Sequence, residues 1–147
     1  MSYTQRFTEV NQPGGELYPA LKIPAVHTGA WLRMSNHQRA IFIVQVGTMV
    51  ATSTLDFSVQ QDDVGDGSNA KAITGKAITQ LTAAGGDGND LVAVEVRTEE
   101  LDVSGGFEYI RGVLTVGTAN VTCALLALRF IPNYPPVAVT GWTEIIG

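Results

Sequence analysis

Cysteine is almost absent from this 147-residue sequence, and charged residues are scarce. The single cysteine, Cys123, excludes an intrachain disulfide framework and any zinc site that needs several cysteines. Charged residues make up 16% of the chain and hydrophobic residues 45%, which is the opposite of the balance that intrinsic disorder requires. Nine Lys and Arg against fourteen Asp and Glu leave a net charge of −5, so nucleic acid is not an expected partner.

The sequence also has no long hydrophobic run. Its apolar runs, such as residues 124–128, are far shorter than the ~20 residues that span a bilayer. The first residues, MSYTQRFTEVNQPGGE, contain neither the apolar stretch nor the small-residue cleavage site of a secretory signal peptide. We therefore expect no membrane partner, and synthesis in the cytoplasm without export.

Residue types that carry catalysis are few and isolated. The spacing of His27 and His37, with no acidic residue nearby, matches no common zinc motif. Cys123 lies in an apolar segment and is interpreted as a buried structural residue. The loop glycines lack the Lys-Ser/Thr pair of a phosphate-binding loop. We predict no catalytic residue, no cofactor and no bound metal ion, and hence no enzyme.

Three acidic clusters remain as candidate ligand sites. They comprise Asp62, Asp63 and Asp66; Asp87, Asn89 and Asp90; and Glu99, Glu100 and Asp102. The first two clusters lack the alternating oxygens and final Glu of a calcium loop, so we interpret them as turns. The third lacks the substrate pocket and the partner of contrasting pKa that acid–base catalysis needs, so we interpret it as solvated charge. Residues 56–108 carry eleven acids and three bases, and complementarity to a basic partner is the alternative.

Alternating hydrophobic patterns predict an all-β fold. Strands are expected at residues 31–34, 40–46, 55–60, 91–97, 107–116 and 121–130. β-branched and aromatic residues supply most of these runs, and Asp-Gly turns separate several of them. Segments 40–46 and 121–130 are apolar on both faces, which is typical of central strands and favours self-association. Together the runs predict a single antiparallel β-sandwich, or jelly-roll-like domain, over residues 31–147 with a C-terminal tail.

The same patterns predict local details. Residues 117–120 form a short turn, so segments 107–116 and 121–130 are expected to make a hairpin. Residues 70–83 are expected to form a short strand or an edge segment, and residues 98–101 a single helical turn. The predicted core residues are Phe42, Val44, Leu55, Phe57, Val94, Ile110, Leu114 and Leu126.

Residues 1–30 are predicted to form an extended N-terminal arm. Pro13, Pro19 and Pro24, with neighbouring glycines, interrupt regular elements. Such a segment lies across a surface of its own domain or of a neighbour, and we expect contact with neighbouring subunits instead of folding into the sandwich. A chain lacking residues 1–26 should then still fold. The expected interface residues are Tyr18, Leu21, Ile23, Val26 and Trp31.

Several motifs from residue 31 onward are similar to those of a known group of proteins. WLRMSNHQRAIFIVQVGTM, TLDFSVQQ, AKAITGKAITQLT and VEVRTEELDVSGGFEYIRGVLTVG resemble small β-rich virion structural proteins of tailed bacteriophages and prophages. The resemblance covers roughly residues 31–130. It implies a head decoration (cement) protein that binds the outer surface of the head and stabilises capsomer contacts. The implied partners are the major capsid protein and copies of the chain itself in a homotrimer.

Two alternatives remain open from the sequence. One is another virion part, such as a neck, tail-completion or fibre-associated β domain. The other is a carbohydrate- or ligand-binding β-sandwich. The absence of a catalytic constellation fits all three hypotheses.

Overall fold

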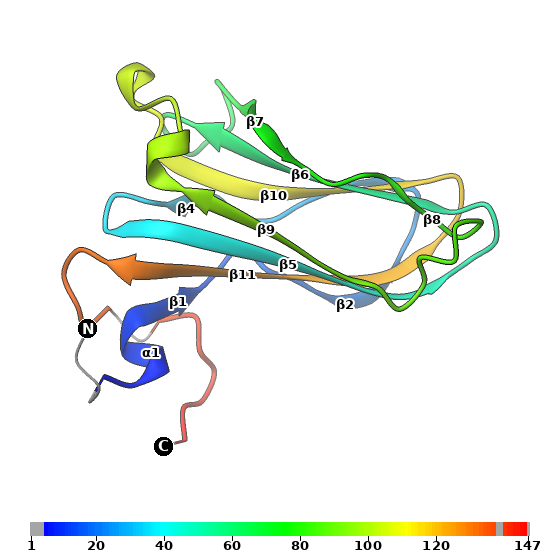
Figure 1. Ribbon diagram of the computed structural model, residues 1–147, viewed down its shortest axis with the longest axis horizontal. Coiled ribbons are helices and arrows are strands. Elements are labelled where there is room, and N and C mark those ends of the chain that lie inside the picture. Colours follow the sequence, from blue (N-terminus) through cyan, green and yellow to red (C-terminus); the bar gives the residue numbers. More distant parts are fainter. Residues whose placement is uncertain (1–4, 138–139, 147) are drawn as a thin grey trace.

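The computed structural model describes residues 5–137 and 140–146 and is built mainly of antiparallel strands in two facing sheets (Figure 1). Sheet A contains β1 (Asn11–Pro13), β2 (Leu17–Lys22), β5 (His37–Met49), β9 (Leu91–Arg97) and β11 (Val121–Pro132). Sheet B contains β3 (Ala25–Thr28), β4 (Leu32–Arg33), β6 (Thr54–Asp62), β7 (Lys71–Ala77), β8 (Leu81–Thr82) and β10 (Tyr109–Gly117). Three short helices, α1 (Phe7–Val10), η1 (Thr98–Glu100) and η2 (Val103–Gly105), lie outside the sheets. The predicted all-β sandwich is confirmed.

The strands pair as nested partners from the two ends of the chain. Both β1 and β2 pair with β11, and both β3 and β4 pair with β10. Further in, β5 pairs with β9, and β6 pairs with β7 and β8. The pairs β11–β5 and β10–β6 then join these partners into the two sheets. Here β1 and β2 lie beside the last strand, and β3 and β4 lie beside the second-last, and this nested pairing is the arrangement of a jelly roll.

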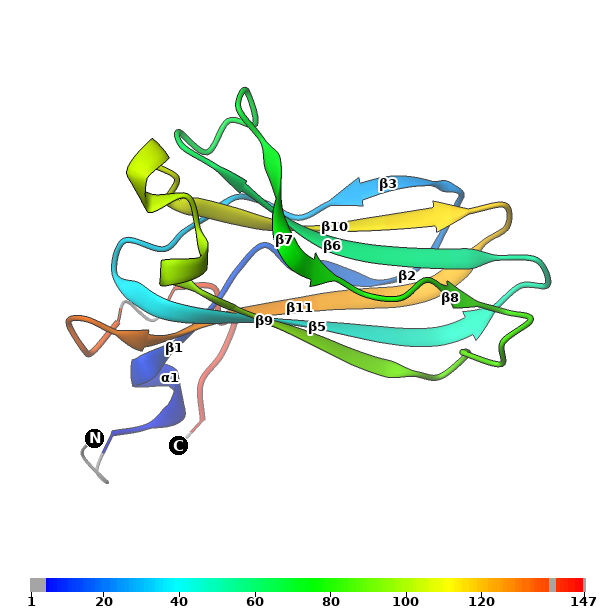
Figure 2. The ribbon, with the colours of Figure 1, turned by 45° about the horizontal axis from the view of Figure 1, so that its top comes forward.

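The predicted hairpin between the last two long strands is wrong. β10 belongs to sheet B and β11 to sheet A, so the turn between them carries the chain across the sandwich. Figure 2 shows β10 in one layer and β11 in the other. A short turn joins strands of two sheets as readily as it joins neighbours in one sheet, and the residues of the turn do not distinguish the two cases.

The core lies between the sheets and follows the predicted alternation. Phe42 and Phe57 meet at its centre with ring centroids 5.9 Å apart. Gly112 on β10 makes room for them, because a Cβ there would lie 2.9 Å from Cε2 of Phe57 and 3.2 Å from Cδ1 of Phe42. Six of the eight predicted core residues are fully buried: Phe42, Val44, Leu55, Phe57, Ile110 and Leu114. Val94 is partly buried and packs against the same cluster.

Leu126 was the one core prediction on the wrong side of its strand. Along β11 the buried side chains are those of Val121, Cys123, Leu125 and Ala127. Because side chains alternate along a strand, Leu126 points away from the core and is 42% exposed. Residues 124–128 are all apolar, so the sequence pattern itself does not show which of the two faces is buried.

The expected separation of the arm from the sandwich is also wrong for its described part. β1 and β2 line the edge of sheet A, and β3 lines the edge of sheet B. Leu17 packs against the core cluster. Removing residues 1–26 would therefore strip both sheets of edge strands, and the truncated chain is not expected to keep its stability. Proline-rich composition predicted an extended backbone, but an extended backbone is also what an edge strand requires.

The predictions for residues 70–83 and 98–101 agree with the structure. β7 and β8 form the far edge of sheet B, as expected for residues 70–83. η1 is the single helical turn expected near residues 98–101. At the same end of the molecule as η1, α1 and the C-terminal segment 140–146 lie below the end of β11 (Figures 1 and 2). Phe7 and Trp142 join them edge to face, with ring centroids 6.3 Å apart.

Candidate partner interface

The outer surface of sheet A is unusually apolar for an exposed sheet face. On β5, alternation buries Phe42 and Val44 and turns Ile41 and Ile43 outward. Strand register places Leu126 of β11 beside Ile43, and Ala93 of β9 on the other side of Ile43. We call this surface the A face. It consists of Ile41, Ile43, Gln45, Leu91, Ala93, Ala124, Leu126 and Leu128.

The A face is hollowed beside the arm. A groove of about 250 Å³ has one wall made by residues 16–19, which include Tyr18 and Pro19. Its floor contains Ile43 and Leu126. The lining is mainly apolar but also includes Glu16 and Gln45, and the groove lies where the sheet surface and the arm come together.

Four of the five predicted interface residues are prominently exposed along the arm. The exposed fractions are 75% for Tyr18, 60% for Leu21, 63% for Ile23 and 62% for Val26. Single exposed apolar residues are common on protein surfaces, but here four lie within nine positions of one segment. Strand register turns Leu21 outward on sheet A, opposite Thr122, and Val26 outward on sheet B, opposite Thr115. We call Leu21, Ile23 and Val26 the arm edge, while Tyr18 stands in the wall of the groove.

Trp31, the fifth predicted interface residue, is engaged within its own chain. The guanidinium of Arg111 lies 4.4 Å from the centre of the Trp31 ring. Two nitrogens of the same guanidinium donate to Oε1 of Gln60, at 3.0 and 2.9 Å. The structure thus brings Tyr18, Leu21, Ile23 and Val26 onto one segment and gives Trp31 an intramolecular contact.

None of the A-face residues was among the predicted interface residues. The signal was present, because segments 40–46 and 121–130 are apolar on both faces. In a two-layer sandwich only one face of each sheet meets the core, so the second apolar face has to lie outside. A second apolar feature that was missed is a cavity of about 680 Å³ between α1 and the end of β11, lined by residues that include Phe7, Val10 and Phe130.

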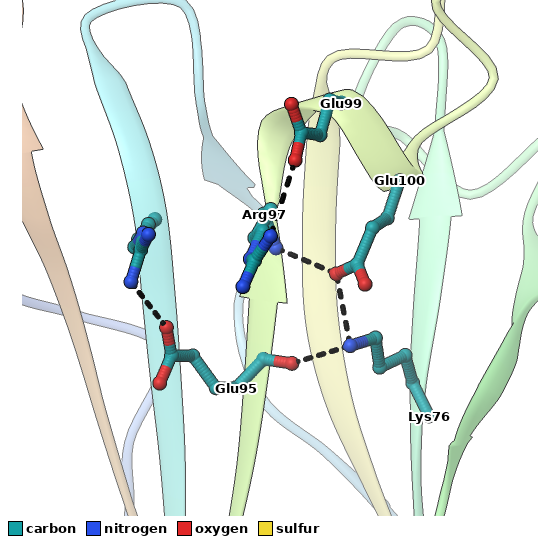
Figure 3. A network of polar contacts seen from close by, with 6 residues as sticks. Lys76, Glu95, Arg97, Glu99 and Glu100 are labelled. Carbon is teal, nitrogen blue, oxygen red and sulfur yellow. Dashed lines mark hydrogen bonds and ion pairs between the residues drawn. The ribbon is translucent and has the colours of Figure 1, made fainter.

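The acidic turn contributes to a network that joins the two sheets (Figure 3). Nζ of Lys76, on β7, lies 2.8 Å from a carboxylate oxygen of Glu100 and donates to the backbone carbonyl of Glu95, on β9, at 2.7 Å. Hydrogen bonds from Lys76 and from the Arg97 backbone N–H lower the pKa of the Glu100 carboxyl. Glu99 pairs with Arg97 at 3.4 Å. These carboxylates therefore hold an edge of the sandwich together.

Asp102 makes different contacts from those of its acidic neighbours Glu99 and Glu100. Its carboxylate accepts from Lys71 at 2.6 Å and from the backbone N–H of Gly105 at 3.0 Å. The Lys71 hydrogen bond is the main cause that lowers the pKa of this carboxyl. Glu99, Glu100 and Asp102 thus pair with three different side chains, those of Arg97, Lys76 and Lys71.

The first acidic loop folds around one buried carboxylate. Asp62 accepts the backbone N–H groups of Gly65, Asp66, Gly67 and Asn69, at 2.7 to 3.1 Å. These hydrogen bonds outweigh the effect of burial and lower the pKa of Asp62. In the second loop, the carboxylate of Asp87 accepts from the backbone of Thr82 at 2.7 Å. Both carboxylates are occupied in shaping turns.

No metal centre is assembled in the part of the chain that the structure describes. Within residues 5–137 and 140–146, no three His, Cys, Asp or Glu side chains are grouped so as to hold an ion. Over the same residues, no helix has the length and apolarity needed to cross a bilayer. Cys123 is buried, and burial raises the pKa of its thiol, which disfavours the reactive thiolate.

The two histidines lie in different environments. His37 is 4% exposed at the start of β5, and neither ring nitrogen has a hydrogen-bond partner. Burial, together with the nearby positive charge of Arg129, lowers the pKa of His37 to about 4. His27 lies on β3, and its Nε2 is 3.0 Å from the carbonyl oxygen of Ile23. The pair forms no joint site.

Comparisons with known proteins give one distant structural similarity. No protein-family model matches this chain, and no curated protein matches its sequence. A cryo-EM structure of Broad Bean Stain Virus matches with a TM-score of 0.43 and 14% sequence identity. The match covers 82% of this chain and 66% of the chain in that structure, so this chain spans just under two thirds of its length. A similarity at this level supports no conclusion about function.

Proposed function

We propose that this chain is a structural assembly protein of a virus particle, without enzymatic activity. The observation that carries the proposal is the apolar surface formed by the A face and the arm edge, which an isolated domain would leave exposed to water. A partner protein that covers this surface would remove that exposure. The carboxylates of Glu100 and Asp62 are occupied in structural contacts.

The finer proposal is a capsid decoration protein on the outer surface of a tailed-phage head. Its support is the sequence resemblance over roughly residues 31–130, together with a rigid jelly roll that offers one apolar docking surface. The proposed partners are the major capsid protein and copies of the chain itself in a homotrimer. The proposed location is the head surface, reached after synthesis in the host cytoplasm.

Quantitative mass spectrometry of purified particles tests this function. The particles should come from the phage or prophage that encodes the chain. A decoration protein should be present at a fixed fraction of the major capsid protein, because it repeats with the symmetry of the shell. Presence in only a single ring's worth of copies would instead support a neck or tail component. Absence from the particles would refute the virion proposal.

A further inference from the structure

We propose that the groove on the A face receives the arm edge of a second copy of this chain, so that copies join edge to face. This inference rests on the proposed assembly role and names the surfaces through which copies meet. The receiving residues are Tyr18, Ile43 and Leu126. The inserted residues are Ile23 and Val26.

The shapes of the two surfaces favour a contact between the groove of one copy and the arm edge of another over a contact between two identical surfaces. The A face is hollow where residues 16–19 rise beside Ile43 and Leu126. The arm edge lies where the chain passes from sheet A to sheet B, and Ile23 and Val26 are 63% and 62% exposed there. Two hollow surfaces would enclose a gap, whereas a projecting edge can fill a groove at interior packing density.

Charge also favours a second copy as the occupant. The chain carries −5 overall, and residues 56–108 alone carry a net −8, so two copies repel each other over much of their surfaces. The A face and the arm edge are neutral by comparison. Arg39 and Glu95, at one end of the A face, neutralise each other in an ion pair at 3.2 Å. The groove lining includes one acid, Glu16, and residues 21–26 of the arm contain none, so contact between the two surfaces brings no two acidic groups together. A basic partner would instead be drawn to the acidic loops.

The backbone of the arm disfavours the other common mode of association, strand addition. Pro19 lies in edge strand β2, and Pro24 directly precedes edge strand β3. Proline has no N–H to offer to an incoming strand, and prolines at edges are a known protection against such pairing. The exposed side chains, and not the backbone, are therefore the groups available to a second copy.

An edge-to-face contact uses two different surfaces of each copy, so every copy can bind one neighbour through its groove and another through its edge. Contacts of this heterologous kind close into rings when the rotation between copies allows it. The homotrimer proposed above is one such ring. A contact between identical surfaces would instead stop at a dimer.

Sedimentation velocity of the full chain over a concentration series, from about 1 µM to about 500 µM, tests the contact. Leu126→Arg in the groove and Val26→Arg on the arm edge should each weaken self-association at least about tenfold. Val103→Arg is the matched control, because Val103 is 63% exposed on η2 and belongs to neither surface. Tyr18→Ala is a second groove variant that alters a side chain outside the core and should also weaken association. Circular dichroism verifies that each variant is folded.

A mixture of the two arginine variants distinguishes a groove-to-edge contact from a contact between two identical surfaces. The Leu126→Arg chain keeps an intact edge and the Val26→Arg chain keeps an intact groove, so an equimolar mixture should form dimers that neither variant forms alone. The proposal is overturned if the wild-type chain stays monomeric throughout the series, or if the folded groove or edge variants associate like the wild type. It is also overturned if the mixture stays monomeric although both variants are folded. A monomeric wild-type chain would also refute the proposed homotrimer. The virion role is decided separately, by the particle stoichiometry.

Discussion

The buried imidazole of His37 should make the fold sensitive to mild acid. Its pKa in the folded chain is about 4, against an ordinary value of 6.5. Because the folded state disfavours the proton, the contribution to stability is fully present above pH 6.5 and is lost as the pH falls from 6.5 towards 4. The separation of the two pKa values sets an upper limit of about 3.4 kcal/mol on the total loss. Between pH 7.5 and pH 5 the loss should be about 2 kcal/mol.

Replacing His37 by leucine isolates this contribution from that of the carboxylates. Leucine has a similar shape and leaves no unpartnered ring nitrogens in the buried site. Urea unfolding of the wild type and of His37→Leu should be compared at pH 7.5, 6.5, 5.5 and 5.0. The stability difference between the two proteins should shift by about 2 kcal/mol in favour of the leucine variant across this range. His27→Gln is the matched control and should retain the wild-type dependence. Parallel pH profiles for the wild type and His37→Leu would refute the reasoning, as would an NMR titration of His37 near pH 6.5.

Three further predictions concern the core, the bridge between the sheets and the acidic loops. Phe57→Ala should reduce the unfolding free energy by ~3–5 kcal/mol in urea titrations, because the ring is fully buried against Phe42; a loss below ~1 kcal/mol would contradict the central packing. Lys76→Met should speed amide hydrogen exchange in β7 and β9 while leaving β10 protected, because Lys76 links the carbonyl of Glu95 to the carboxylate of Glu100. Unchanged exchange in both β7 and β9 would count against this bridging role. A chelator should leave the melting temperature unchanged, because Asp62 is engaged by backbone N–H groups; a drop of several degrees would show that the loops bind an ion.

Local pattern in the sequence was sufficient to predict the long strands beyond residue 30 and most of the core. The alternation of residues 55–60 and 91–97 places one set of side chains inward, and β6 and β9 follow it. This works because a strand with one polar face can bury only the other. The same rule failed at Leu126, where both faces of the segment are apolar and only the neighbouring strands decide which one meets the core.

The assignment of strands to sheets was decided by tertiary structure alone. The turn at residues 117–120 predicted a hairpin, but pairing in a jelly roll joins segments from opposite ends of the chain, such as β2 with β11. Such long-range partners leave no periodic signal in a single sequence. For the same reason, the sequence indicated an extended arm but not that it completes the edges of both sheets.

The candidate interface, too, was predicted from the sequence only in part. Exposed apolar residues spaced along a proline-rich segment were enough to predict Tyr18, Leu21, Ile23 and Val26 as contact residues, and this remains a prediction. The groove beside Tyr18 could not be predicted, because it is formed where the arm, β5 and β11 come together from distant parts of the chain. Sequence sets the polarity of each residue, whereas the packing of the strands determines which apolar residues share a surface and whether that surface is hollow or projecting.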